Sequence, residues 1–317
     1  MSVVNDMYSE EFESEIEIGV LSPLADPVVE EIYKDEEVAG LAAESFISAV
    51  LAECGEKFGN VIELTPQKRQ TQLGNRSCYI DVFAKSDTGR IATQEVQLYF
   101  DPSILQRNLL EAAYSYVGGA RKGTTAVEMA SEMPNVSAIN IFGHINNCRK
   151  ENRELLQPIH CVYDKAPREP ALKQFAIFNI QLPYFTEAPE DYSNLLYRWC
   201  KLLYEMHFNK KLPKEVFAME PEMREFVESD AGAAQFVDRY SEATASPVIR
   251  QSYRDWVLAD FRERSMLQGA RSEGREEGRE EGRLEIAKKL LKNNVPINKI
   301  IEYTELSLEK IETLRNV

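Results

Sequence analysis

The chain has 317 residues, long enough for about two domains and for a sizeable hydrophobic core. With 44% hydrophobic residues, 28% charged residues, 15 Gly and 14 Pro, its composition excludes collagen-like, low-complexity and wholly disordered proteins. The net charge of -15 is concentrated at the N-terminus, because residues 1–60 carry 15 acidic residues and only two bases. The nearly neutral remainder leaves nucleic acid open as a partner.

Neither a membrane segment nor a secretion signal is indicated. No run approaches the ~18 apolar residues that a membrane helix needs, and residues 1–20 are acidic where a signal peptide would be basic. The five cysteines are odd in number and scattered, which argues against a disulfide framework and a zinc ribbon. We therefore expect a folded, cytoplasmic protein with no membrane partner.

Hydrophobic periodicity predicts an α/β region followed by a helical region. Residues 1–20 are expected to form an acidic tail without regular structure. Apolar spacings of three and four predict a helical hairpin or one broken helix at 26–51. Short β-branched and aromatic runs predict strands at 60–64, 77–85, 91–100, 136–142, 158–163 and 174–182. A helix is predicted over 103–122, with an apolar stripe typical of a core-facing surface: Ile104, Leu105, Leu109, Leu110, Ala113 and Val117.

Residues 186–317 are predicted to be helical throughout. Gly274, Gly278 and Gly282 recur every four residues in a Glu/Arg-rich helix and form one slowly winding stripe. Two interpretations stay open: a solvated, charged linker helix, or a surface for homo-oligomerisation through this C-terminal helix. Beyond it, short amphipathic helices are separated by predicted breaks at 294–296 and 305–307.

Segment 77–100 predicts a β-hairpin with its turn at residues 87–89. If these three residues form the loop, Asp81 lies opposite Glu95 on the neighbouring strand. A two-residue loop would instead place Gln94 opposite Asp81. Cross-strand partners lie about 4.5 to 5.5 Å apart at Cβ, so like charges placed there repel each other.

A cation between the two carboxylates would remove that repulsion. Asp81 and Glu95 therefore form a candidate Mg²⁺ site, since Mg²⁺ takes one or two carboxylates and keeps waters for a substrate phosphate. Gln97 lies on the same strand face as Glu95, because side chains alternate along a strand. The alternative is a pair of exposed charges on a solvated hairpin.

This hairpin resembles the motif of the PD-(D/E)XK nucleases. In that motif an Asp and a Glu on a hairpin bind Mg²⁺, and a third residue, usually Lys, follows two positions after the Glu. The matching segment is IDVFAKSDTGRIATQEVQ, in which Asp81, Glu95 and Gln97 fall on the motif positions.

From about Leu24 onward the chain also resembles the bacterial family of recombination-promoting nucleases and transposases. DPVVEEIYKDEE is similar to that family's opening helix, and Arg107 and Tyr116 match an Arg and an aromatic in its next helix. Trp199 and the tail GREEGREEGRLEIAKKLLKNNVPINKIIEYTELSLEKIETL are the most recognisable part.

The resemblance implies an α/β fold. Its restriction-endonuclease-like core, a mixed β-sheet flanked by helices, is expected at 21–185 and is followed by an all-α C-terminal region. That region is expected to divide into a helical part at 186–268 and a repeat helix with a small helical module at 269–317. The implied function is a DNA endonuclease that depends on Mg²⁺ (or Mn²⁺), hydrolyses phosphodiester bonds and is linked to recombination or mobile elements.

In the implied site, Asp81 and Glu95 bind the metal, Gln97 orients water or phosphate, and Arg107 and Tyr116 bind the substrate DNA. Glutamine, however, cannot supply the positive charge of lysine.

Gln181 and Tyr184 also stand where the family commonly shows an acid and a lysine. The alternative function is therefore a catalytically weakened member that acts as a DNA-binding or oligomeric interaction protein.

Overall fold

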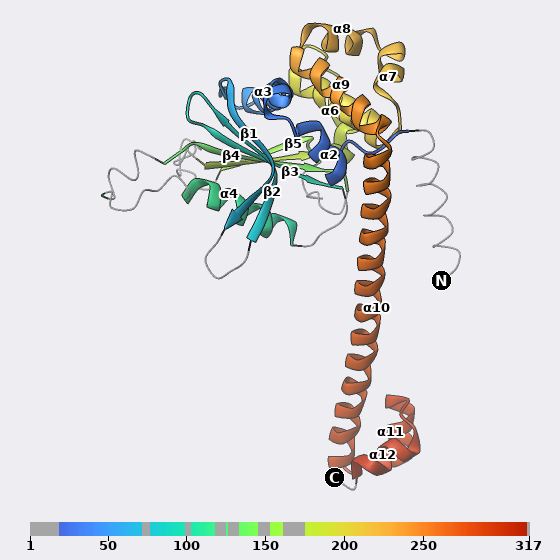
Figure 1. Ribbon diagram of the computed structural model, residues 1–317. Coiled ribbons are helices and arrows are strands. Elements are labelled where there is room, and N and C mark those ends of the chain that lie inside the picture. The colour runs from blue at the N-terminus through green and yellow to red at the C-terminus, as the bar shows by residue number, and fades with distance from the viewer. Residues whose placement is uncertain are drawn as a thin grey trace. The chain divides into compact units, whose positions relative to one another are not determined.

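The computed structural model describes residues 19–71, 77–98, 103–117, 125, 133–144, 153–160 and 175–315. The chain separates into two compact units, Met1–Arg254 and Asp255–Val317. The first unit contains one β-sheet with helices on both faces (Figure 1). The second unit is helical.

Six strands form the sheet, in the order β1-β2-β3-β4-β6-β5. Their bounds are Val61–Thr71 for β1, Ser77–Ser86 for β2, Ile91–Gln97 for β3, Val136–Phe142 for β4, Leu156–His160 for β5 and Phe175–Gln181 for β6. Strands β1, β2 and β3 pair antiparallel, β4 is parallel to β3 and β6, and β5 is antiparallel to β6. The mixed sheet, flanked by helices and followed by a helical C-terminal region, is consistent with the expected restriction-endonuclease-like α/β fold.

Strand β1 extends beyond residues 60–64, where the sequence predicts it to end before Pro66. Pro66 pairs with Val82, and β1 is the outermost strand, where proline is tolerated. Gln67 follows with a φ of 47°, yet the register continues unbroken to the pair Lys68 and Ile80. The N-terminal residues 1–18 and the predicted element ends at 99–100, 118–122, 161–163 and 174 lie outside the described residues.

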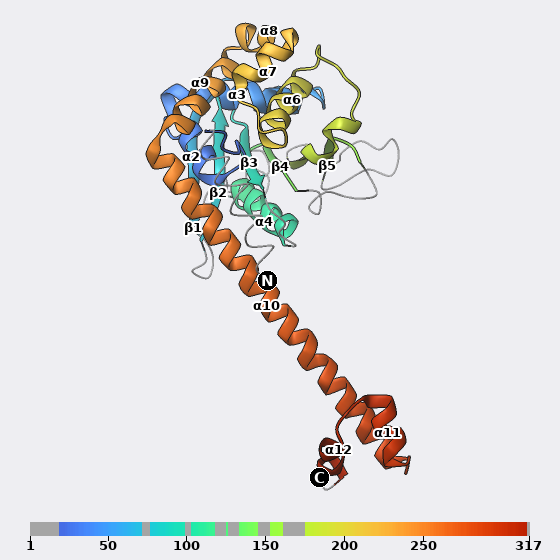
Figure 2. The ribbon, with the colours of Figure 1, turned by 90° about the vertical axis from the view of Figure 1, so that its right-hand side faces the viewer.

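Helices α2 (Asp26–Tyr33), α3 (Glu36–Ala52), α6 (Leu195–His207) and α9 (Ala231–Ala245) cover one face of the sheet (Figures 1 and 2). The predicted helical segment 26–51 is thus two helices. Helix α4 (Ile104–Val117) covers the other face. The remaining elements of this unit are a 3-10 helix, η2 (Leu182–Glu187), and helices α7 (Pro213–Met219) and α8 (Pro221–Ser229).

Trp199 of α6 holds the helical layer together. Its ring is 1% exposed and makes edge contacts with Phe46, Phe226 and Phe236 at centroid distances of 5.6, 5.5 and 5.4 Å. Its indole N–H donates to Ser45 Oγ at 3.1 Å, so the buried polar atom is satisfied. Helices α3, α6, α8 and α9 therefore share one aromatic core.

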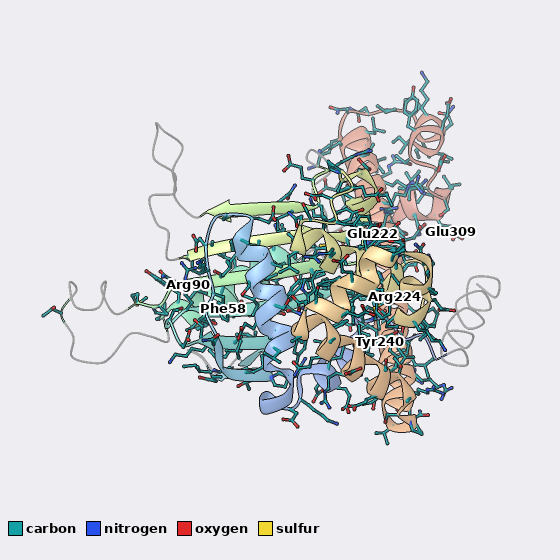
Figure 3. All side chains as sticks on the ribbon, turned by 90° about the horizontal axis from the view of Figure 1, so that it is seen from above. Phe58, Arg90, Glu222, Arg224, Tyr240 and Glu309 are labelled. Atoms are coloured by element: carbon teal, nitrogen blue, oxygen red, sulfur yellow. The ribbon has the colours of Figure 1, made fainter. Side chains whose placement is uncertain are left out.

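The chain before α2 is anchored to the same layer. Tyr240 of α9 (labelled in Figure 3) donates to the Leu21 carbonyl at 2.7 Å. Arg239 donates to the carbonyls of Glu31 and Ile32 at the C-terminal end of α2, at 3.2 and 3.4 Å. These bonds fix both ends of α2, whose first residue is Asp26.

Helix α4 contradicts most of the predicted apolar stripe. Leu105, Leu109, Leu110 and Val117 are 38 to 58% exposed. Ile104 is buried as predicted, and the other buried residues of the helix are Asn108, Glu111, Ala112 and Ser115. The helix is turned this way because part of the sheet face beneath it is polar, with Glu95 on β3 and Asn140 on β4.

The second unit contains the C-terminal part of α10 (Pro247–Lys292), then α11 (Ile297–Thr304) and α12 (Leu308–Arg315). The predicted breaks at 294–296 and 305–307 are confirmed. Asn294 and Glu305 both adopt left-handed φ angles of 55° there. A small core holds the module together: Ala287, Ile300, Leu306 and Ile311. None of the described helices combines the length and apolarity needed to cross a membrane.

Candidate metal centre

The turn between β2 and β3 sets the register of the candidate site. The N–H of Ser86 donates to the Arg90 carbonyl at 2.9 Å, and Gly89 has a φ of 79°, which a glycine adopts without strain. Val82 pairs with Gln94, so Asp81 lies opposite Glu95. The structure therefore has the three-residue loop rather than the two-residue alternative.

Residues of the connection between α3 and β1 bind the turn and hold it in place. Both carboxylate oxygens of Asp87 accept hydrogen bonds from Asn60, from the backbone N–H and the side-chain amide. Arg90 forms an ion pair with Glu56, and Thr88 Oγ1 donates to the Phe58 carbonyl at 2.7 Å; Phe58 and Arg90 are labelled in Figure 3. The hairpin is thus held at its tip, on residues that contribute nothing to the acidic site.

Asp81 and Glu95 each accept a backbone hydrogen bond from the opposite strand. The Val96 N–H donates to Asp81 Oδ2 at 2.8 Å, and the Asp81 N–H donates to Glu95 Oε1 at 3.3 Å. A third donor is Gln67, whose Nε2 lies 3.3 Å from Asp81 Oδ1. Glu95 is only 5% exposed, so the exposed-charge alternative does not describe this carboxylate.

Two further acids, which the sequence analysis did not identify, lie beside this pair. Burial raises the pKa of Asp81 to about 7, and the charge of Asp26 is the next largest cause. Burial and then the Asp81 charge raise the pKa of Glu95. Burial also raises the pKa of Glu111 to about 7, although the Arg107 charge opposes the increase. The metal-free site therefore holds protons at pH values where ordinary carboxylates are ionised.

The donor set suits a hard divalent cation. Carboxylate oxygens are the ligands that Mg²⁺ and Mn²⁺ prefer, and one or two of them are sufficient for Mg²⁺. Among the described residues, no three His, Cys, Asp or Glu side chains already surround a common point. Asp81 and Glu95 would therefore supply two ligands, and the surrounding side chains would have to rearrange for a third protein ligand to reach the cation.

Arg107 connects Gln97 to the acids. Its Nη2 donates to Gln97 Oε1 at 3.1 Å, and its Nε lies 3.8 Å from Glu111 Oε1. The Arg107 side chain is 47% exposed, so part of the guanidinium faces solvent. A positive charge therefore lies beside the amide that occupies the third motif position.

Tyr116 is the other predicted substrate-binding residue, and Gln181 and Tyr184 are the two positions that depart from the family pattern. Tyr116 makes an edge contact with Phe175 at a centroid distance of 5.8 Å, and this contact gives no support to its predicted role in DNA binding. Gln181 is buried and donates to the Glu154 carbonyl at 2.6 Å. Tyr184 is buried against Ile104 and Phe142.

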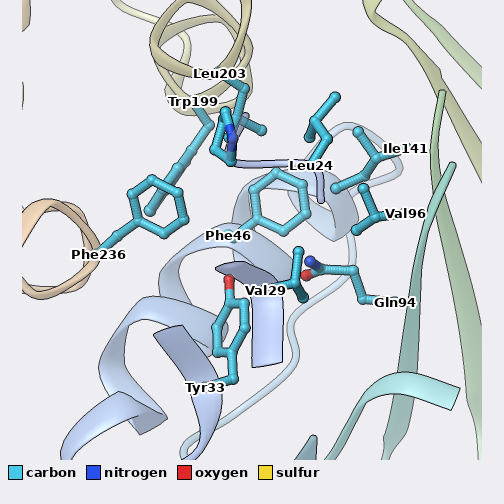
Figure 4. A pocket seen from close by; sticks show the side chains of 11 residues that line it. Leu24, Val29, Tyr33, Phe46, Gln94, Val96, Ile141, Trp199, Leu203 and Phe236 are labelled. Carbon is cyan, nitrogen blue, oxygen red and sulfur yellow. The ribbon is translucent and has the colours of Figure 1, made fainter. Parts of the chain in front are cut away.

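A pocket lies on the opposite face of β3 from Glu95 (Figure 4). Its walls are mostly apolar, and the Gln94 side chain hydrogen-bonds Tyr33 there. Its lining residues include Leu24, Val96 and Trp199, all of them buried. It contains none of the four acids and belongs to the packing between the sheet and the helical layer.

One family model matches the chain. It describes the PD-(D/E)XK nuclease family transposase and matches residues 36–256, a range that includes the hairpin, α4 and Trp199. No curated protein and no solved structure matches the chain significantly.

Proposed function

Because the chain belongs to the PD-(D/E)XK nuclease family transposases, we propose that it is a divalent-metal-dependent DNA endonuclease. Membership suggests nuclease or mobile-element function and implies contact with DNA. The observation that carries the proposal is the pairing of Asp81 and Glu95 across the β2–β3 hairpin, in surroundings that raise the pKa of both carboxyls.

Asp81 and Glu95 would hold Mg²⁺ or Mn²⁺. When bound, the cation would lower the pKa of a bound water and neutralise charge on the phosphate under attack. Gln97 would orient water or phosphate through its amide. Arg107 would supply the charge that glutamine lacks, because its guanidinium donates to Gln97 Oε1 and is partly open to solvent. Tyr116 stays a predicted substrate-binding residue.

Plasmid cleavage tests this proposal. The purified chain is titrated with Mg²⁺ or Mn²⁺ and compared with an EDTA control, and Asp81→Asn and Glu95→Gln are assayed beside it. Both variants should lose cleavage and Mn²⁺ binding by calorimetry. Glu63→Gln is the matched control, because Glu63 is a β1 acid paired with Lys68 outside the site. Unchanged Mn²⁺ affinity in Asp81→Asn would overturn the metal assignment.

The second candidate is a catalytically weakened member that binds DNA or acts as an oligomeric interaction protein. It is favoured by Gln97 and by the buried, uncharged Gln181 and Tyr184. Metal binding and DNA binding without cleavage at any Mg²⁺ or Mn²⁺ concentration would support this function over the endonuclease. Self-association, if it occurs, is proposed to use the Gly274, Gly278 and Gly282 stripe, around which a Cβ atom would meet nothing within 4 Å in the described chain.

A further inference from the structure

Helix α4 presents two buried oxygens that have no hydrogen-bond donor. They are Asn108 Oδ1 and Glu111 Oε2. The two residues are 3% and 2% exposed and lie three positions apart, on the same face of the helix. An unsatisfied buried acceptor costs about 1–3 kcal/mol, so two of them side by side indicate a missing proton, water or cation.

Beneath these oxygens, one row of neighbouring residues across three strands of the sheet is polar. Glu95 on β3 pairs with Asn140 on β4, which pairs with Asn179 on β6. Asn108 Nδ2 donates to Asn140 Oδ1 at 2.8 Å, and Asn140 Nδ2 donates to Asn179 Oδ1 at 2.8 Å. The amides are therefore aligned in one direction, which leaves the free carbonyl oxygen at the α4 end of the row.

Glu111 of α4 encloses the same buried polar region from the side of the helix. Its carboxyl lies within hydrogen-bonding reach of the Glu95 carboxyl. The Glu111 side chain is enclosed here, and its Oε2 receives no hydrogen bond from any described donor. Arg107 forms an ion pair with the other oxygen of Glu111, with its Nε 3.8 Å from Oε1, and Oε2 stays without a hydrogen-bond partner.

We infer that Glu111 is a third carboxylate ligand of the divalent cation, and that Asn108 Oδ1 accepts a hydrogen bond from a water bound to it. This inference rests on the proposed function, since it extends the site formed by Asp81 and Glu95. It gives Asn108 Oδ1 a hydrogen-bond donor that no described group supplies. It also explains why α4 turns a carboxylate and an amide toward the sheet while its leucines face solvent.

The test is Mn²⁺ binding to the full-length protein, measured by calorimetry and by the EPR signal of free Mn²⁺. Loss of a hydrogen-bonded neighbour of a metal ligand typically weakens metal affinity by about 10–100-fold, so loss of a direct ligand should weaken it at least tenfold. Glu111→Gln should therefore raise the Mn²⁺ Kd by about tenfold or more. Ser115→Ala, one turn further along the same buried face, is the control and should bind Mn²⁺ like the parent.

Asp81→Asn, measured in parallel, separates the two proposals. If Asp81→Asn loses Mn²⁺ binding and Glu111→Gln keeps the parental Kd, the inference about Glu111 is wrong and the proposed metal site stands. If Asp81→Asn also binds like the parent, the proposed function loses its metal site. If circular dichroism shows that Glu111→Gln does not fold, Glu111→Asp replaces it, because aspartate keeps the charge on a shorter side chain. It should bind Mn²⁺ more weakly than the parent, and parental affinity there would overturn the inference.

Discussion

Replacing Asp81 with asparagine should stabilise the metal-free protein at pH 8, although Asp81 is a proposed metal ligand. In the parent, the partly buried Asp81 carboxyl lies near the charges of Asp26 and Glu111. An asparagine keeps the shape and removes the charge. Its Oδ1 still accepts the hydrogen bond that the Val96 N–H donates to Asp81 Oδ2 at 2.8 Å.

The size of this stabilisation follows from the raised pKa of Asp81. Burial and then Asp26 raise the pKa of Asp81 from 3.8 to about 7. At 1.36 kcal/mol per pKa unit this corresponds to about 4 kcal/mol. Because the folded pKa is the higher one, this stability is fully present below pH 3.8 and is lost as the pH rises through about 7. Asparagine does not ionise, so the variant should be about 2–4 kcal/mol more stable than the parent at pH 8, after allowance for the weakened Gln67 contact.

Thermal unfolding at pH 5 and pH 8, with EDTA or with excess Mn²⁺, measures this effect. At about 2–4 °C per kcal/mol, the variant should melt roughly 4–16 °C above the parent in EDTA at pH 8, and the difference should shrink at pH 5. Mn²⁺ at 100 times its Kd should stabilise the parent by about 2.7 kcal/mol and leave the variant unchanged. A variant that melts below the parent in EDTA at pH 8 would refute the electrostatic reasoning.

Three further outcomes are expected. Gln67→Val should lower the free energy of unfolding in urea by about 1–3 kcal/mol despite the high strand propensity of valine, because φ is 47° there, and Gln67→Gly should cost less. Burial lowers the pKa of His207 to about 3, so the free energy of unfolding should fall as the pH drops below 6.5, by about 2–3 kcal/mol at pH 4.5. In urea titrations at pH 4 to 7, His207→Gln should make the free energy of unfolding less dependent on pH. Deleting residues 269–317 should lower the oligomeric state, and light scattering that shows the same number of chains per particle would contradict self-association through α10.

The sequence predicted the strands and limited the hairpin register to two alternatives, because both depend on local patterns. Alternation and the turn residues 87–89 indicate the hairpin, and the observed pair of Val82 and Gln94 then selects the three-residue loop that places Asp81 opposite Glu95. The helical segment 26–51 and the breaks in the second unit follow from apolar spacing in the same way.

Glu111 and Asp26 could not be identified by these patterns. Each reaches the hairpin through tertiary packing, and α4 was misoriented because periodicity assumes that the apolar face of a helix is the buried one. A usable signal was present, since Asn108, Glu111 and Ser115 share one face of α4 at helical spacing. A polar face of this kind beside a candidate metal hairpin indicates a helix that contributes to the site.

The order of strand pairing also has a kinetic meaning. Asp81 and Glu95 are 14 residues apart and meet in an antiparallel hairpin, whereas Gln94 pairs with Ile139 only through a long parallel crossover. Local pairing needs little loop closure, so the hairpin can form before β4 and β6 dock on β3. Bound Mn²⁺ would then act in the folding transition state and accelerate refolding, in addition to slowing unfolding. Stopped-flow refolding with and without Mn²⁺ should show a faster rate for the parent and no change for Asp81→Asn.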